Sequence, residues 1–216
     1  MSQERNELGE STMIIMHHLR KSRAIFMTAF LEELGVDYEL RLYDRNEVRR
    51  APPELREVHP LGKSPVIEDQ GMTIAESGAI TTYLIDTYDT EHKFAPARDG
   101  GAEYFHYLQW LHYAEGSMGS PMLLNLLTRR EDPKPPIVTG FTKGETALHL
   151  GYMEAALEGQ DYILGNDFSG ADVSCGYMAN GAKQLKLLEN YPNVDAYASR
   201  LTGRPAFQRA FGKTGG

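Results

Sequence analysis

Cysteine and long apolar runs are scarce in this chain of 216 residues. Cys175 is the single cysteine, which excludes an internal disulfide framework and favours a reducing compartment, the cytoplasm. No stretch approaches the roughly 20 consecutive apolar residues of a membrane span. The N-terminal residues are polar and acidic and lack the pattern of a signal peptide. We therefore expect a cytoplasmic protein with no membrane partner.

Positive charge is also in deficit. Lys and Arg number 22 against 30 Asp and Glu, and the formal net charge of −8 argues against nucleic acid as the main partner. His17 and His18 are adjacent on an expected strand and point to opposite faces, whereas His106 and His112 are six positions apart on an expected helix. Neither pair can chelate one ion, and no Cys-x-x-Cys is present, so no metal is expected.

Hydrophobic residues make up 41% of the chain, enough for a packed core, and their spacing divides it in two. The first part alternates between strand and helix patterns after a polar tail at residues 1–12, which we expect to be flexible. Strands are predicted at 13–16 and 36–43, a helix at 23–34 that Gly35 ends, a hairpin turning at 68–71, and a helix at 79–87.

The second part shows no strand pattern. Residues 89–101 contain proline and a double glycine and predict a linker. We expect an α/β domain at 13–88 and an all-helical domain at 102–216. The predicted helices of the latter cover 102–127 (interrupted near Gly119–Pro121), 142–157, 170–188, 194–201 and 205–211.

The run Gly62-Lys63-Ser64 has the residues that end a phosphate-binding loop. Glu57 stands where such a loop needs its first glycine, and Pro65 follows where a helix should begin, so nucleotide hydrolysis is not expected. Pro65 can open an edge strand as a trans proline. As a cis proline it would instead turn the backbone of the preceding residue toward an extended peptide.

Two serines stand where helices are expected to begin, Ser22 and Ser77. Each can be a plain N-cap that stabilises its helix by about 1 kcal/mol. Each can instead offer a hydroxyl and helix N–H groups to an anion, and Glu76 can take the ammonium group of a zwitterionic ligand. A thiol bound at Ser22 would ionise more easily than free cysteine. Tyr107 and Trp110, on an aromatic helix face, suit either the core or an apolar pocket.

Taken in order, five blocks of the sequence resemble cytosolic glutathione transferases, most closely the theta-like types of bacteria and fungi. In the segment FSGADVSCGYM, Ser169 takes the cap position of the family's capping box and Asp172 the third helical position. The resemblance implies a thioredoxin-like N-terminal domain, an all-α C-terminal domain and a homodimer. The other blocks are MIIMHHLRKSRAIFMTAFLEELGVDYEL, HPLGKSPVIEDQGMTIAESGAITTYL, YLQWLHYAEGSM and RPAFQRAF.

The resemblance also implies how glutathione binds as co-substrate. Pro65 would be cis, and the backbone of Ser64 would pair with the cysteinyl part of the tripeptide. Glu76 and Ser77 would hold the γ-glutamyl end, and Lys63 would lie near the glycyl carboxylate. Ser64 stands where the family often has valine, which is tolerable because the backbone does the binding.

Ser22 matches the serine that contacts the sulfur, although an alignment slip of one residue would favour Arg23. The chain lacks the first-strand tyrosine of some members and the cysteine of the thiol-reductase members. We expect transfer of glutathione to a small hydrophobic electrophile, bound near Leu19, Arg20, Tyr107 and Trp110. The alternatives are glutathione-dependent ether cleavage, dehalogenation, isomerisation or peroxide reduction at the same site, or non-catalytic binding of a ligand or partner.

Overall fold

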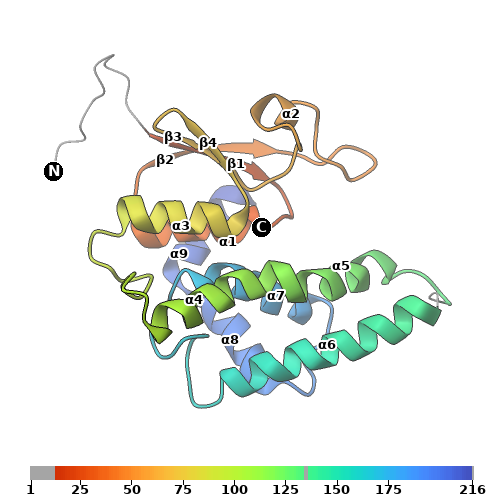
Figure 1. Ribbon diagram of the computed structural model, residues 1–216. Coiled ribbons are helices and arrows are strands. Elements are labelled where there is room, and N and C mark those ends of the chain that lie inside the picture. The colour runs from red at the N-terminus through yellow and green to blue at the C-terminus, as the bar shows by residue number, and fades with distance from the viewer. Residues whose placement is uncertain (1–12, 134–135, 216) are drawn as a thin grey trace. The chain divides into compact units, whose positions relative to one another are not determined.

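The computed structural model describes residues 13–133 and 136–215, and the expected flexible tail at 1–12 lies outside them. The chain forms two compact units (Figure 1), an α/β unit and a helical unit, which confirms the expected fold class. None of the helices in the described part of the chain is long and apolar enough to span a bilayer. Of the described residues, the α/β unit comprises 13–88 and 205–215, and the helical unit comprises 89–133 and 136–204.

A mixed four-stranded sheet in the order β2-β1-β3-β4 forms the centre of the α/β unit. Strand β1 pairs in parallel with β2 and antiparallel with β3, and β3 and β4 form the expected hairpin. Gln70 (φ 48°) and Gly71 (φ 78°) make its tight turn, in the left-handed conformation that suits the twist of a hairpin. The strands are β1 (Ile14–Leu19), β2 (Tyr38–Tyr43), β3 (Val66–Asp69) and β4 (Met72–Ala75).

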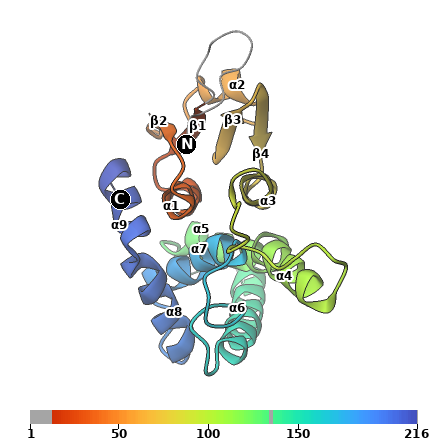
Figure 2. The same cartoon turned by 90° about the vertical axis from the view of Figure 1, so that its left-hand side faces the viewer.

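Two helices, α1 (Ala24–Leu34) and α3 (Ser77–Tyr88), lie side by side on one face of this sheet (Figure 2). Helix α1 ends as predicted, with Gly35 left-handed at φ 67° and its N–H bonded to the Leu31 carbonyl at 3.1 Å. A short helix, α2 (Leu55–Val58), occupies a segment that the sequence predicted as loop. Only Leu55 of its four residues is buried, so no apolar periodicity marked it.

The last helix, α9 (Pro205–Thr214), packs against α1 and so belongs to the α/β unit, whereas the sequence placed it in the helical domain. Phe207 meets Phe26 edge to face, with ring centroids 4.9 Å apart. This apolar contact joins segments almost as distant in sequence as the chain permits. The pattern of α9 shows that it is helical but not which surface it covers.

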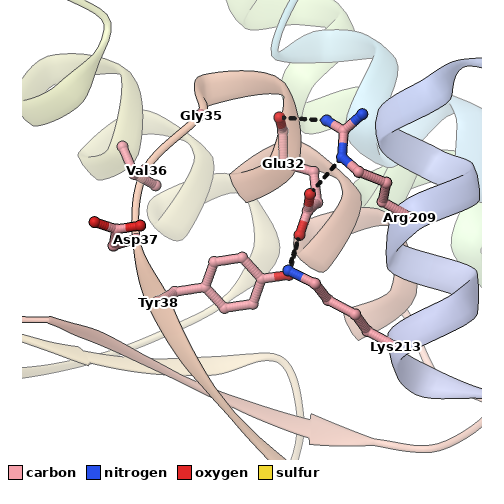
Figure 3. Close-up of a pocket in the computed structure, with 7 residues that line it drawn as sticks. All are labelled: Glu32, Gly35, Val36, Asp37, Tyr38, Arg209 and Lys213. Carbon is pink, nitrogen blue, oxygen red and sulfur yellow. Dashed lines mark hydrogen bonds and ion pairs between the residues drawn. The ribbon is translucent and has the colours of Figure 1, made fainter.

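An ionic latch beside that contact is built on Glu32 of α1 (Figure 3). Its carboxylate, 9% exposed, accepts hydrogen bonds from Arg209 Nε at 2.7 Å and Lys213 Nζ at 2.5 Å. The Tyr38 hydroxyl donates to it at 2.5 Å. Burial by itself would raise the pKa of Glu32, but the bonds from Lys213, Tyr38 and Arg209 outweigh it and hold the pKa at about 2. The latch is therefore ionised at neutral pH.

The helical unit has no strand in its described residues, only a single bridge between Tyr162 and Gly165. A π-helical turn at Ala114–Met118 separates its first two α-helices, so the predicted interruption is present and ends where α5 begins at Gly119. Pro121 fits because it lies in the first turn of a helix, where its missing N–H costs little. The helices are α4 (Ala102–Tyr113), α5 (Gly119–Thr128), α6 (Pro136–Ala156), α7 (Ala171–Gln184) and α8 (Pro192–Gly203).

Candidate active site

The Ser64-Pro65 peptide bond is cis, as the sequence resemblance implied. Pro65 is buried and immediately precedes β3. The Ser64 hydroxyl donates to the His17 carbonyl at 2.8 Å and accepts the Leu19 N–H at 3.0 Å. Among the described residues, no hydrogen bond uses the backbone N–H or C=O of Ser64. Those two groups are therefore available to an extended peptide.

Lys63, one residue earlier, is exposed, and its ammonium group has no ion-pair partner within residues 13–133 and 136–215. Lys63 immediately precedes Ser64, whose backbone N–H and C=O are free in the described part of the chain. A lysine is a mobile point charge that suits a carboxylate at the end of a bound peptide.

Glu76 adopts a left-handed backbone with φ 73°, which is uncommon for any residue other than glycine. Its carbonyl accepts the Ile80 N–H at 2.9 Å, so Glu76 is the N-cap of α3 and Ser77 is its first helical residue. The prediction of Ser77 as the N-cap is wrong by one position, because the chain turns into the helix at Glu76.

The Glu76 carboxylate is exposed and the Ser77 side chain is largely buried, and the described residues offer neither a hydrogen-bond partner. The N–H groups of the first helical turn have no partner in the helix itself. A carboxylate that is free to take a cation thus adjoins N–H groups and a hydroxyl that are free to take an anion. This pairing of charges matches the amino and carboxyl groups of an α-amino acid.

Ser22 lies in the turn between β1 and α1, with 8% of its surface exposed. Its hydroxyl oxygen accepts the Ala24 N–H at 3.2 Å, and helix α1 begins at Ala24 after Arg23 in the N-cap place. Because the oxygen is the acceptor in that bond, the hydroxyl proton remains free to be donated to an anion. The positive end of the α1 dipole favours negative charge at this point.

Buried contacts hold the start of α1 on the sheet. The Thr28 hydroxyl donates to the Ala24 carbonyl at 2.9 Å, so it accepts from His18 Nδ1, also at 2.9 Å. Burial, with a smaller effect from Arg20, lowers the pKa of His18 to about 4, and the imidazole is neutral at physiological pH. The bond from β1 to α1 therefore does not depend on pH in the neutral range.

His17, on the other face of β1, has a different role that the sequence did not reveal. Its Nε2 lies 2.6 Å from Glu68 and its Nδ1 lies 2.8 Å from the Tyr43 hydroxyl, so it joins three strands. The opposite orientation of His17 and His18 is confirmed. Within the described residues, no group of three or more His, Cys, Asp or Glu side chains is placed to hold a metal ion.

The four residues expected at an electrophile pocket fall in different units. Leu19 is buried, and the Arg20 guanidinium is bound to the Thr214 carbonyl and to Asp44, 3.2 Å away. Tyr107 and Trp110 belong to the core of the helical unit. These packing contacts fit the alternative in which the aromatic face is core, and the pocket stays a prediction.

The core position of Trp110 is defined by its neighbours. Its ring stacks on Tyr152 with centroids 4.8 Å apart, and its N–H donates to His106 at 3.0 Å. A hollow of about 420 Å³ lies beside these three side chains. Trp110 itself is 0% exposed, so its surface is not open to a ligand there.

Asp172 is fully buried at the start of α7, and both oxygens of its carboxylate accept hydrogen bonds. One carboxylate oxygen accepts the Ser169 N–H and hydroxyl, both at 2.8 Å. The other accepts the Ile163 N–H at 3.0 Å and the Tyr197 hydroxyl at 2.7 Å. The contact expected between Ser169 and Asp172 is present and holds the fold. The predicted cap position is wrong by one residue, because Gly170 is the N-cap of α7 and Asp172 is its second helical residue.

Comparison with known proteins covers most of the chain. The family model for the glutathione S-transferase N-terminal domain matches residues 11–86, and the model for the C-terminal domain matches residues 121–209. Glutathione S-transferase 3 of Schizosaccharomyces pombe is 33% identical over 208 residues, which are 90% of this chain and 85% of that protein.

Solved structures agree with these matches. A glutathione S-transferase of Actinobacillus pleuropneumoniae is 35% identical, with a TM-score of 0.85 over 94% of each chain. A glutathione transferase homologue of Lodderomyces elongisporus, solved with two GSH per subunit, is 26% identical, with a TM-score of 0.80 over 93% of this chain and 98% of that one. The chain therefore belongs to the glutathione S-transferase family.

Proposed function

We propose that this glutathione transferase uses Ser22 to ionise the thiol of its co-substrate, glutathione, for attack on a small hydrophobic electrophile. The observation that carries the proposal is the Ser22 hydroxyl, which accepts the Ala24 N–H and keeps its proton for a ligand. A hydrogen bond to a thiolate, with the helix dipole behind it, lowers the pKa of the thiol from the value near 8.5 of free cysteine. Ser22 would also aim the sulfur, which contributes through orientation.

The rest of the tripeptide is assigned to the unpaired groups of the same unit. The backbone of Ser64, freed beside cis Pro65, pairs with the cysteinyl residue. Glu76 takes the γ-glutamyl ammonium group, and the start of α3 with Ser77 takes its carboxylate. Lys63 then lies near the glycyl carboxylate. Each of the ligand's charged groups is thereby given a partner of opposite sign.

The test of Ser22 is a pH titration of thiolate absorbance in the complex with glutathione, wild type against Ser22→Ala. We expect bound glutathione to ionise at higher pH in the variant, and turnover at neutral pH to fall about 10²-fold, as for loss of one positioned donor. Glutathione should still bind, because its ends are held elsewhere. If the two titrations superimpose, Ser22 is a cap, and an Arg23→Gln variant should then show the shift instead.

A second candidate reaction is thiol–disulfide exchange, favoured by the two GSH per subunit in the Lodderomyces relative. The thiolate of one glutathione would attack a mixed disulfide of another, which forms oxidised glutathione and releases the other thiol as its thiolate. Cys175 could not serve as an internal thiol, because it is buried and burial raises the pKa of its thiol.

The electrophile class is open between transfer, ether cleavage, dehalogenation, isomerisation and the reduction of peroxides or disulfides, because all share the thiolate. Turnover of the pure protein with glutathione and one substrate of each class would rank them. Binding of glutathione with no turnover in any class would instead favour a non-catalytic carrier.

A second copy of the chain is the proposed partner, in a homodimer. Apolar side chains at helical spacing are exposed along α6, with Ile137 82%, Phe141 47% and Leu148 63% accessible. Leu127 of α5 is 63% accessible as well. Such a concentration is typical of an interaction surface. Sedimentation at micromolar concentration should give twice the chain mass, and a single species of 24.2 kDa would contradict the proposal.

A cytoplasmic location is the last element of the proposal. It is supported by the single, unpaired and buried cysteine, which needs no oxidising compartment. Fractionation of the source cells should recover the protein with cytoplasmic markers, and recovery with a secreted fraction would contradict it.

A further inference from the structure

The side chain of Ser64 forms hydrogen bonds to the end of β1, at a position where two paired strands would ordinarily be joined by backbone hydrogen bonds. In the antiparallel ladder between β1 and β3, Ile15 is opposite Glu68 and His17 is opposite Val66. Continued by two residues, the same register sets Leu19 opposite Ser64, with Pro65 between. Proline has no N–H to donate, so the backbone ladder stops there.

The Ser64 hydroxyl occupies the interrupted position. It accepts the Leu19 N–H at 3.0 Å and donates to the His17 carbonyl at 2.8 Å. Leu19 lies beyond the last paired residue of the ladder, and its buried N–H would be left without a partner if the hydroxyl were absent, which is costly. The His17 carbonyl is already opposite Val66 in the ladder, so the bond from Ser64 is an additional one. A hydroxyl is suited to this position because one oxygen can donate and accept at once. Alanine could do neither, and neither could valine, which the family often has here.

We infer that the Ser64 hydroxyl is a positioning residue for glutathione: it acts as the strand partner of Leu19 and His17, so that the backbone of Ser64 remains free for the tripeptide. The inference rests on the proposed function. It extends that function by assigning to the Ser64 side chain a role that the family resemblance gives only to the backbone. The same two bonds set the spacing between the free N–H and C=O of Ser64 and the chain that leads from Leu19 to Ser22.

The experiment compares Ser64→Ala, Ser64→Val and Ser64→Thr with the wild type. Threonine retains the hydroxyl, and valine retains the bulk of threonine without it. Ser174→Ala is the matched control, since Ser174 is also a buried serine and its hydroxyl has no partner among the described residues. Glutathione binding is measured by calorimetry, and the KM values for glutathione and for a chromogenic aryl halide are measured separately.

We expect the Ala and Val variants to raise the Kd and KM for glutathione by about tenfold, the effect of one or two lost hydrogen bonds. The KM for the aryl halide should not change, because the Ser64 hydroxyl is assigned to glutathione alone. A general loosening of the fold would instead raise the KM values for both substrates. The Thr variant should remain within about twofold of the wild type, and Ser174→Ala should have no effect on binding.

Hydrogen exchange of the Leu19 amide in the free protein gives a readout that needs no ligand. It should accelerate in the Ala and Val variants and not in the Thr variant. A Val variant that binds glutathione as the wild type does would overturn the inference and leave the proposed function intact. An equal loss in the Thr and Val variants would also overturn it. A wild type that does not bind glutathione would overturn the proposed function first.

Discussion

Two helices of this protein have a serine and an acidic residue at or beside their start, and the two starts differ in the exposure and the pairing of the acid. At α7, Asp172 is fully buried and four donors from Ser169, Ile163 and Tyr197 occupy both of its oxygens. At α3, Glu76 is exposed, left-handed in its backbone and without a partner among the described residues, beside Ser77, whose hydroxyl is also unpaired there.

The difference shows that residue type does not distinguish a structural helix start from a binding one, whereas the accounting of hydrogen bonds does. Buried polar groups are almost always paired, and a fully paired cluster such as that of Asp172 has no group left for a ligand. An unpaired cluster on an uncommon backbone conformation is a reasonable place to look for function. By this criterion the start of α7 holds the fold, and the start of α3 is the proposed binding end for glutathione.

The largest effect on stability should come from the fully paired start of α7. Asp172→Ala leaves two backbone N–H groups and two hydroxyls without an acceptor in the core. We expect it to cost about 3–5 kcal/mol of unfolding free energy. Urea unfolding followed by circular dichroism measures this cost, with the exposed Asp167→Ala as control. A cost below about 1 kcal/mol would mean that the comparison between the two starts is mistaken.

Glu32 provides an intermediate case, an acid that is nearly buried but paired with cations rather than with backbone. Its pKa of about 2 in the folded protein is below its ordinary value of 4.5, so the unfolded state binds the proton more readily. The stabilisation is therefore complete above about pH 5.5 and is lost as the pH falls toward 2.

Glu32→Gln should accordingly cost about 2 kcal/mol at pH 7. The gap between variant and wild type should narrow as the pH is lowered from 5 to 3. Urea unfolding across that range tests the sign of the effect. A difference in unfolding free energy that stays constant with pH would show that the latch stabilises the fold by packing rather than by charge.

Features set by neighbours in sequence were predictable, and those set by distant contacts were not. Gly35 ends α1 and the Gln70–Gly71 turn closes the hairpin because both depend on local backbone preferences. The cis bond at Pro65 was accessible only through the family resemblance, because local sequence favours the trans form.

The latch could not be predicted, because Glu32 and Arg209 lie 177 residues apart and nothing local links them. The left-handed turn at Glu76 was also hidden, since a glutamate gives no signal for positive φ. Its neighbour Ser77 carries the ordinary preference for an N-cap, which is why the helix start was predicted one residue too late. The candidate residues were therefore identified from sequence, but their geometry required the fold.

The most direct test of the difference between the two helix starts is calorimetry of glutathione binding to Glu76→Ala beside the wild type. The variant loses one charged contact to the ligand and no contact within the described fold. We expect the Kd to rise about tenfold, or about 1.4 kcal/mol, with the unfolding midpoint unchanged or slightly raised. An unchanged Kd would remove Glu76 from the glutathione site and contradict the assignment of the start of α3 as the binding end of this unit.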